Sequence, residues 1–271
     1  MDDNPFKILN SLALVLTKVA KFSAVAAFSI RKGGQSPPSL DSLNFSTKQG
    51  DSLDNVRTNL GVLAEFLNID AGNIATCNQV HGDTVAVINS VSSSPPKADA
   101  IVAAQPGIFP AVKTADCVPI LLMDPVHKVC AAVHAGWRGT ALRVTRKVVR
   151  LMQEDFGTDV SDLVAAIGPA IGPCCYEVDD NVLIPVSRNV PWADSFVTLE
   201  MNHESGNPAR GKSYRLDLVG VNRFELTSMG VQEANIYSTD LCTSCRPDLF
   251  FSHRRDGVPS GRHIAVTGFK E

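Results

Sequence analysis

The sequence lacks the features that mark several large classes of protein. It has no block of five or six like charges, and 25 basic residues nearly balance 28 acidic ones, for a formal net charge of −3. Such a chain offers no electrostatic footprint for nucleic acid or for an anionic membrane. Its first apolar run, residues 12–16, ends at Lys18, well short of the roughly 20 apolar residues of a membrane span. We therefore expect a cytoplasmic protein with a small-molecule partner, no nucleic acid partner and no membrane partner.

Histidine and cysteine are scarce, with six and seven residues. An odd number of cysteines at uneven spacing is not typical of a secreted disulfide framework, so we expect free thiols in a reducing compartment. Cys242 and Cys245 form a CxxC without a second CxxC or a nearby HxxxH, so no zinc ribbon is predicted, and redox or metal chemistry there is the minor alternative. The turn rich in glycine and proline before Cys174 and Cys175 indicates an architectural role for that pair.

The order of apolar patterns predicts one α/β domain. With 271 residues, of which 44% are hydrophobic, the chain is long enough for a substantial core. Apolar periodicity and end signals predict helices over residues 52–67, 138–156 and 216–229, and strands over residues 118–123, 129–133 and 163–167. Because strands and helices interleave without a long linker, we expect a single layered domain over residues 1–271, with residues 1–20 a peripheral N-terminal extension.

Polar clusters interrupt the apolar runs at three predicted strand ends, where functional side chains gather on a rigid scaffold. The clusters are residues 78–83, 114–117 and 134–140. Each holds one side chain able to bind a metal, namely His81, Cys117 and His134. Two imidazoles and one thiolate suit zinc and leave its fourth position open for water or substrate. The three residues are 36 and 17 positions apart, and each one alone is more often a packed core residue.

Two segments favour binding of an anion. In the first, a strand ending at His134 is followed by glycines and by a helix opening at Arg138, which together offer free N–H groups, a positive helix end and a guanidinium. In the second, residues 250–257 pass from apolar to basic. This second segment is either a strand end with solvated arginines or a further anion clamp in which His253 transfers a proton.

Taken in order, these motifs resemble those of the bacterial purine nucleoside phosphorylases formerly called polyphenol oxidase or laccase-domain proteins, a family also connected with peptidoglycan editing. The resemblance extends from about Phe28 to the C-terminus. At position 253 this chain has histidine where the family more often has tyrosine. The segments that carry the resemblance are residues 81–83 (HGD), 114–119 (TADCVP), 134–140 (HAGWRGT), 167–169 (IGP), 175–178 (CYEV) and 250–257 (FFSHRRDG).

The resemblance implies a fold of two β-sheets with outer helices (α/β/β/α), built from duplicated βαβ-like units. It also implies a zinc ion, with copper as the alternative, bound by His81, Cys117 and His134. The implied activities are phosphorolysis of adenosine, inosine and S-methyl-5′-thioadenosine and deamination of adenosine. The partners are then a purine nucleoside and inorganic phosphate, and we expect a monomer or a weak homodimer.

Roles for individual residues follow from position within these motifs. Catalysis is assigned to Cys117, His134, Asp116 and Arg138. Asp116, or Asp83 in its place, would orient a metal ligand or carry a proton. Binding of substrate and phosphate is assigned to Arg31, Asn44, Arg138, His253 and Arg254.

Three other functions compete with this one. A copper oxidase is the first, because two histidines and a cysteine are also the equatorial set of a blue-copper site, although six histidines are too few for a multicopper laccase. The second is a cysteine hydrolase acting on peptidoglycan precursors, with Cys117 as nucleophile and His134 as base. The third is a binding module with a closed metal site and no catalysis.

Overall fold

The computed structural model describes residues 5–200 and 213–271. The first six-stranded sheet has the order β1 (Phe6–Leu9), β2 (Ala13–Leu16), β3 (Ala24–Ser29), β15 (His263–Phe269), β7 (Phe109–Thr114), β4 (Ile74–Thr76). The second has the order β14 (Ile236–Ser238), β10 (Val164–Ile167), β8 (Val118–Asp124), β9 (Val129–Ala135), β6 (Ala100–Ala103), β5 (Val85–Ile88). A small third sheet has the order β11 (Glu177–Val178), β13 (Ser213–Leu216), β12 (Val197–Glu200). The α-helices are α1 (Leu53–Leu67), α2 (Trp137–Ala141), α3 (Val144–Phe156), α4 (Asp180–Asn189), α5 (Leu218–Ser228) and α6 (His253–Asp256).

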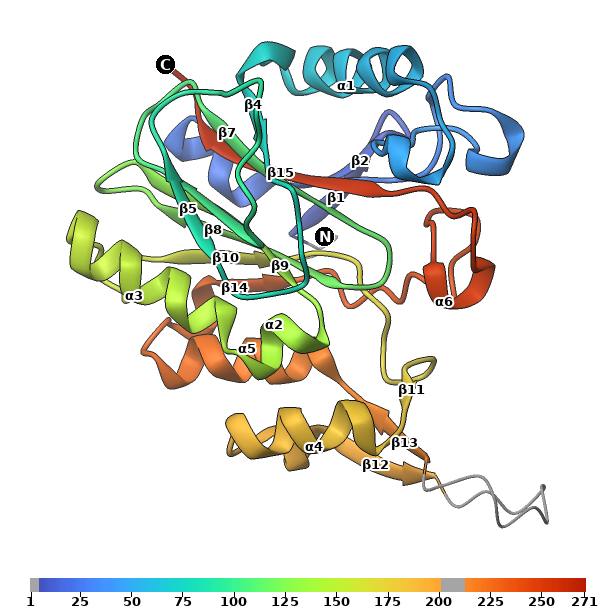
Figure 1. Cartoon of the computed structure of the whole chain (residues 1–271). Helices are drawn as coiled ribbons and strands as arrows, with labels where there is room; N and C mark the ends of the chain where they lie inside the picture. The colour runs from blue at the N-terminus through green and yellow to red at the C-terminus, as the bar shows by residue number, and fades with distance from the viewer. Residues whose placement is uncertain (1–4, 201–212) are drawn as a thin grey trace.

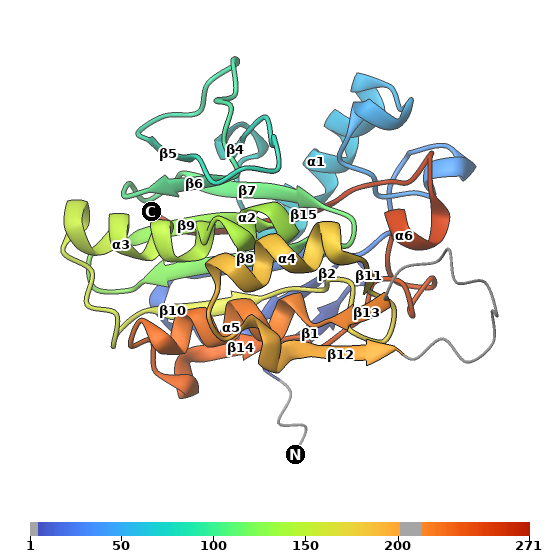
Figure 2. The same cartoon turned by 60° about the horizontal axis from the view of Figure 1, so that its bottom comes forward.

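The two large sheets pack face to face, with α1 on the outer face of the first sheet and α2, α3 and α5 on the outer face of the second (Figures 1 and 2). Alternation along β8 shows how the sequence builds this arrangement. Leu121 and Met123 point into the core between the sheets, whereas Ile120 and Leu122 pack beneath the helices. Since both faces of these strands are buried, they appear in the sequence as continuous apolar runs. The predicted α/β/β/α layering is confirmed.

A close approach between the sheets depends on Gly168, directly after β10. A Cβ atom added there would lie 2.3 Å from the ring of Phe28, which belongs to β3 of the facing sheet. Real side chains do not approach so closely, so the position requires glycine. Gly168 is the glycine of the IGP motif, so this glycine is required by the packing of the two sheets at the end of β10.

The helix predicted over residues 138–156 is in fact two helices. The backbone of Arg143 is left-handed (φ 59°) and separates α2 from α3. The break is fixed by α5, because the Arg143 guanidinium pairs with the nearly buried Glu225 at 2.9 and 3.0 Å. Asn222 of the same helix donates to Thr140 at 2.9 Å and accepts from Thr145 at 2.8 Å, on either side of the break. The helical period was predicted correctly, but it does not predict the break at Arg143, which depends on these tertiary contacts.

The N-terminal segment differs from the predicted peripheral extension. Within its described part, residues 5–20, β1 and β2 extend the edge of the first sheet, and β2 pairs with β3. Leu14 and Leu16 are buried in the core between the sheets. This segment is therefore part of the domain. In the described part of the chain, no helix is long and apolar enough to cross a membrane.

His263 of β15 gives a prediction about the pH dependence of stability. Burial lowers its pKa to about 3, and its Nε2 accepts a hydrogen bond from the Phe251 backbone N–H at 2.8 Å. In the unfolded chain the imidazole takes up a proton below about pH 6.5, so the unfolded state gains protons first as the pH falls. We expect this contribution to stability to be complete above that pH and to be lost progressively below it.

Two measurements check this prediction. NMR should show no titration of the His263 ring between about pH 5 and 8. The free energy of unfolding of the His263→Asn variant should fall less steeply than that of the wild type between about pH 7 and 5. A titration of the His263 ring near pH 6.5 would contradict the prediction.

Candidate functional site

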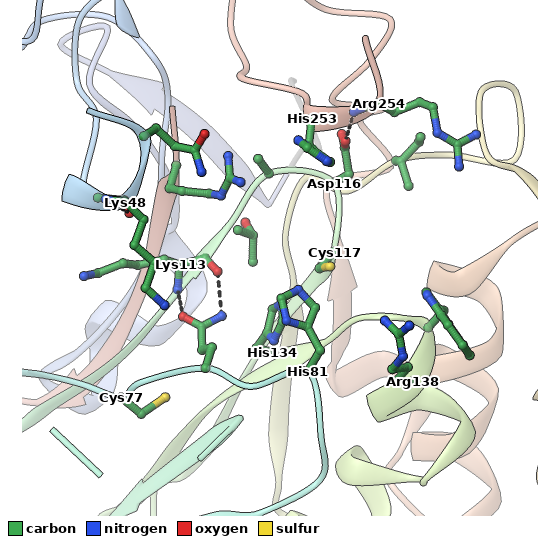
Figure 3. Close-up of a pocket in the computed structure, with 18 of the residues that line it drawn as sticks. Lys48, Cys77, His81, Lys113, Asp116, Cys117, His134, Arg138, His253 and Arg254 are labelled. Carbon is green, nitrogen blue, oxygen red and sulfur yellow. Dashed lines mark hydrogen bonds between the residues drawn. The ribbon is translucent and has the colours of Figure 1, made fainter. Parts of the chain in front are cut away.

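One cavity of about 650 Å³ brings the three polar clusters of the sequence together. It lies where β4, β7 and β9 end and β8 begins, so both large sheets contribute to its walls (Figure 3). The volume is in the range of small-molecule sites. The lining includes most of the residues assigned from the sequence, namely His81, Asp116, Cys117, His134, Arg138, His253 and Arg254.

At the centre of the cavity, the ligand atoms of His81, Cys117 and His134 all lie within 4.8 Å of one another. Cys117 directly precedes β8 and His134 lies in β9, and the antiparallel pairing of these strands, with Pro119 opposite His134, brings the two together. His81 comes from the loop after β4, and its ring stands edge-on to that of His134 with centroids 4.9 Å apart. The sequence therefore identified a group of residues that do converge in space.

The carboxylate of Asp99 holds two of these three residues in place. It is fully buried, and its oxygens accept hydrogen bonds from His134 Nδ1 at 2.9 Å, from the backbone N–H of His81 at 2.9 Å and from that of Gly82 at 2.7 Å. Burial acts to raise the pKa of Asp99, but the hydrogen bonds from His134 and Gly82 hold it below its usual range. Because Nδ1 of His134 is engaged by Asp99, Nε2 is the ring nitrogen left to face the cavity.

Charge interactions within the group stabilise the thiolate of Cys117. Burial acts to raise the pKa of Cys117, but the charge of His134 and hydrogen bonds from both histidines lower it to about 6. Burial conversely acts to lower the pKa of His134, and the charges of Cys117 and Asp99 raise it to about 9. A thiolate is therefore present at neutral pH, as a metal ligand must be. Two imidazoles and a thiolate, with a carboxylate behind one imidazole, fit zinc with one open coordination position.

Basic side chains surround this group. Lys48 and Lys113 lie on one side of the two histidines and Arg138 on the other (Figure 3). Arg254 and Arg262 complete the basic residues of the lining, and in the described part of the chain Asp116 is its only acidic residue. Burial lowers the pKa of Lys113. The cavity thus concentrates positive charge within a protein whose net charge is −3.

The acidic exception, Asp116, is already engaged by neighbouring loops. Its side chain accepts from Thr243 Oγ1 at 2.6 Å and from the Arg254 backbone N–H at 2.7 Å, and its backbone carbonyl accepts from the Ile171 N–H at 2.9 Å. The residue has a left-handed backbone (φ 92°) directly before Cys117. These contacts support the positioning role suggested for Asp116. Asp83, the alternative, is paired with Lys147 and does not line the cavity.

Arg138 is one of the exposed cations of the cavity. Its guanidinium lies 4.2 Å from the centre of the Trp137 ring and makes no hydrogen bond or ion pair with any residue that the structure describes. The positive helix end predicted beside it is weaker than expected, because α2 has only five residues before the Arg143 break. The guanidinium, rather than the helix end, is therefore the main positive charge at this position.

The two α6 residues face the cavity from the opposite wall. His253 Nδ1 lies 3.2 Å from the Gly257 carbonyl, so this nitrogen carries a proton and Nε2 is free to exchange one. The Arg254 guanidinium donates to the Glu177 carbonyl at 2.8 Å and stacks on Tyr176. Both residues lie where a bound molecule would contact them.

Two of the residues assigned to substrate binding lie outside the lining. Arg31 donates to the carbonyls of Asp41 at 3.0 Å and Pro247 at 2.9 Å. Asn44 is fully buried and bonds the backbone of Ser46 and of Arg262, both of which line the cavity. The structure therefore gives Asn44 a supporting position behind the wall, and contact of either residue with substrate stays a prediction.

Comparison with known proteins places the chain in a family. Residues 25–270 match the family model described as multi-copper polyphenol oxidoreductase laccase. The chain belongs to this laccase family. The protein named purine nucleoside phosphorylase YlmD, from Geobacillus stearothermophilus, is 35% identical over 263 residues, covering 92% of this chain and 91% of the relative.

Two further members of the laccase family show the same relationship. The protein named adenosine deaminase RL5, from an unknown prokaryotic organism, is 34% identical over 251 residues, covering 88% of this chain and 91% of the relative. The crystal structure of the Bacillus licheniformis hypothetical protein YfiH has a TM-score of 0.89 and 32% identity, over 98% of this chain and 100% of that one. The fold described above is therefore the laccase-family fold.

Sequence reasoning missed several residues of this laccase-family site. Asp99 stands alone between a proline-rich loop and a short strand, and no motif marks it. Gln79 belongs to the polar cluster of residues 78–83, for which the sequence predicts no role beyond that of His81, yet it exchanges hydrogen bonds of 2.7 and 2.8 Å with the backbone of Lys113 and so joins the His81 loop to β7. The basic residues Lys48, Lys113 and Arg262 come from three distant segments. No local pattern gathers such residues, because their proximity is a product of the fold.

The buried Asp99 carboxylate yields a testable prediction. We expect Asp99→Asn to weaken Zn²⁺ binding at His81, Cys117 and His134 about 10- to 100-fold, because an amide cannot accept every hydrogen bond that orients the two histidines. Competition against a chromophoric chelator measures the affinity.

A matched control for this variant is Asp124, the last residue of β8; β8 belongs to the same sheet as β6, which Asp99 directly precedes. Asp124 is equally buried, and it accepts from His127 Nδ1 at 2.9 Å and from the Val126 and His127 backbone N–H groups at 2.8 and 3.0 Å, but it does not line the cavity. Asp124→Asn should lower stability and leave the zinc affinity unchanged. Equal loss of zinc from both variants would show a general effect of unfolding.

Proposed function

We propose that this chain is a zinc-dependent purine nucleoside phosphorylase that also deaminates adenosine. The observation that carries the proposal is the sharing of one cavity by a three-ligand metal set and five basic side chains. A nucleoside and a phosphate ion together need a cavity of this size and charge. The names of the relatives, purine nucleoside phosphorylase and adenosine deaminase, support the same pair of activities.

In phosphorolysis, a phosphate oxygen forms a bond to the anomeric carbon of the ribose while the bond to the purine nitrogen breaks. The products are ribose 1-phosphate and the free base, and the departing nitrogen gains a proton. Arg138 would hold the phosphate and place it against the anomeric carbon, and the other basic side chains of the lining add positive charge around it. Their charge also stabilises phosphate in a cavity partly closed to water. His253, with a free Nε2, is the side chain we assign to proton transfer to the base.

Deamination replaces the amino group at purine C6 by oxygen and releases ammonia. A zinc ion held by His81, Cys117 and His134 would supply Lewis-acid activation of water near neutral pH. Asp99 keeps the Nε2 of His134 directed into the cavity, and Asp116 holds the Cys117 loop against α6 and Thr243. Adenosine, inosine and S-methyl-5′-thioadenosine share the purine ring that would lie against this metal set. The proposal therefore places all three substrates in the same position.

A second function is favoured by one specific observation. Without a metal, Cys117 with a pKa of about 6, His134 with a pKa of about 9 and the buried Asp99 form a thiolate, imidazolium and carboxylate series. That is the arrangement of a cysteine hydrolase, and amide substrates such as peptidoglycan precursors would be its targets. A chelator would inactivate the zinc enzyme and spare the hydrolase. Stoichiometric copper in the purified protein would instead support an oxidase.

The first test of the proposed function uses inosine. We expect the purified protein to release hypoxanthine only when inorganic phosphate is present, because phosphate is the attacking group. Chromatography of the bases and of ribose 1-phosphate follows the reaction, with a chelator-treated sample as the control. Base release that is independent of phosphate would show a nucleoside hydrolase, and no release from metal-loaded protein would overturn the proposal.

The second test concerns Arg138. We expect Arg138→Ala to raise the KM for phosphate about 10- to 100-fold, because a charged hydrogen bond is worth about 1.5–3 kcal/mol, and Arg138→Lys to be intermediate. Arg150→Ala removes an exposed arginine of α3 that does not line the cavity and should leave this KM unchanged. Steady-state kinetics of each protein at varied phosphate and fixed inosine give the KM for phosphate. An unchanged KM in Arg138→Ala would remove this residue from the phosphate site.

A further inference from the structure

A second group of metal-binding side chains lies outside the cavity. The sulfur atoms of Cys174, Cys175, Cys242 and Cys245 all lie within 4.8 Å of one another. Cys174 and Cys175 come from the turn before β11, and Cys242 and Cys245 from the loop that follows β14. The structure thus pairs the CxxC that had no partner in the sequence with the adjacent cysteines about 70 positions earlier. Nothing in the proposed reaction uses these four thiols.

The distances between the sulfurs identify the chemistry. The Sγ of Cys245 lies 3.5 Å from that of Cys174 and 3.4 Å from that of Cys175. A disulfide would need about 2.05 Å. Four sulfurs bound tetrahedrally to one zinc ion, each at about 2.3 Å from it, lie about 3.8 Å apart. The four cysteines are therefore grouped at close to the spacing of a tetrahedral site.

Neighbouring backbone completes the site. The Gly172 N–H donates to the Cys242 sulfur at 3.3 Å, the kind of contact that stabilises a thiolate ligand. A Cβ atom at Gly172 would lie 3.3 Å from the Cys174 sulfur, so a side chain there would crowd the group. The turn is fixed by Gly172 as well, because its carbonyl accepts from the Cys175 and Tyr176 N–H groups at 3.0 and 2.9 Å. We infer that Cys174, Cys175, Cys242 and Cys245 together bind one structural zinc ion, separate from the metal set of the cavity.

Such an ion would fasten two loops that form one wall of the cavity. Between the members of the CxxC, Thr243 bonds Asp116 through its hydroxyl and the Ala170 carbonyl through its N–H, at 2.6 and 2.9 Å. On the other loop, Tyr176 lines the cavity directly after Cys175 and carries the Arg254 guanidinium on its ring. The four cysteines are thus positioning residues: they hold the loops that place Asp116, Tyr176 and Arg254.

Metal analysis of the reduced protein, purified without added metal, tests the inference. We expect two zinc ions per chain in the wild type, one in Cys245→Ser and one in Cys174→Ser, because loss of one thiolate opens a tetrahedral site. Cys130→Ala removes a buried thiol outside both groups and should keep two. If the cavity proved to hold no metal, the difference of one zinc between wild type and Cys245→Ser would remain, so the two proposals fail separately.

A second measurement does not depend on the folding of cysteine variants. In the double variant His81→Ala, Cys117→Ala the cavity keeps one ligand of three, and the remaining zinc should show four sulfur neighbours at about 2.3 Å by X-ray absorption spectroscopy. Hydrogen exchange should be faster in residues 172–176 of Cys245→Ser than in the wild type. Zinc with nitrogen or oxygen neighbours, no zinc in this double variant, or disulfides found by thiol counting in the freshly purified wild type would each overturn the inference.

Discussion

The carboxylate of Asp99 receives four hydrogen bonds in a space closed to solvent, from the His134 ring and from the Val80, His81 and Gly82 backbones. Burying a carboxylate costs free energy unless the charge accepts hydrogen bonds in this way, so movement of any of these donors away from Asp99 would destabilise the fold. His81 adopts a left-handed backbone (φ 59°), which turns consecutive N–H groups toward one anion. The Asp99 carbonyl also accepts from the His134 N–H at 2.8 Å. One residue therefore sets the backbone and the ring orientation on which the metal set depends.

The rest of the site arises from the meeting of two sheets. The first sheet brings Lys113 at the end of β7, and the second brings His134 at the end of β9. Packing the sheets face to face aligns strand ends that are far apart in sequence, and loops from both sides then close the space. Positive charge collects there while the remainder of the surface balances it, so the chain carries a strong local field with almost no net charge. This contrast suits capture of a small anion.

Much of this architecture could be predicted, because local apolar patterns in the sequence specify it. The continuous apolar runs of β8 and β9 and the apolar face of α1 gave correct elements, and His81, Cys117 and His134 converge as the motifs indicated. What failed depends on tertiary contacts. The break at Arg143 is set by Glu225 on another helix. α4 contains Pro185, a residue that usually ends a helix, and the four-cysteine group joins segments separated by about 70 residues. Asp99 belongs to the same class, since a solitary aspartate has no signature until its donors are placed around it.

The hairpin of β8 and β9 gives the 17-residue spacing of Cys117 and His134 a physical meaning. The spacing is the length of two paired strands and their turn. The pairing of these strands therefore fixes where the thiolate and the imidazole meet. A slip of one residue in the pairing would turn His134 to the opposite face of the sheet. Insertions in the turn, residues 125–128, lengthen the connection without moving the paired ends. Relatives that vary in length within this hairpin should therefore do so at its tip and nowhere along its strands.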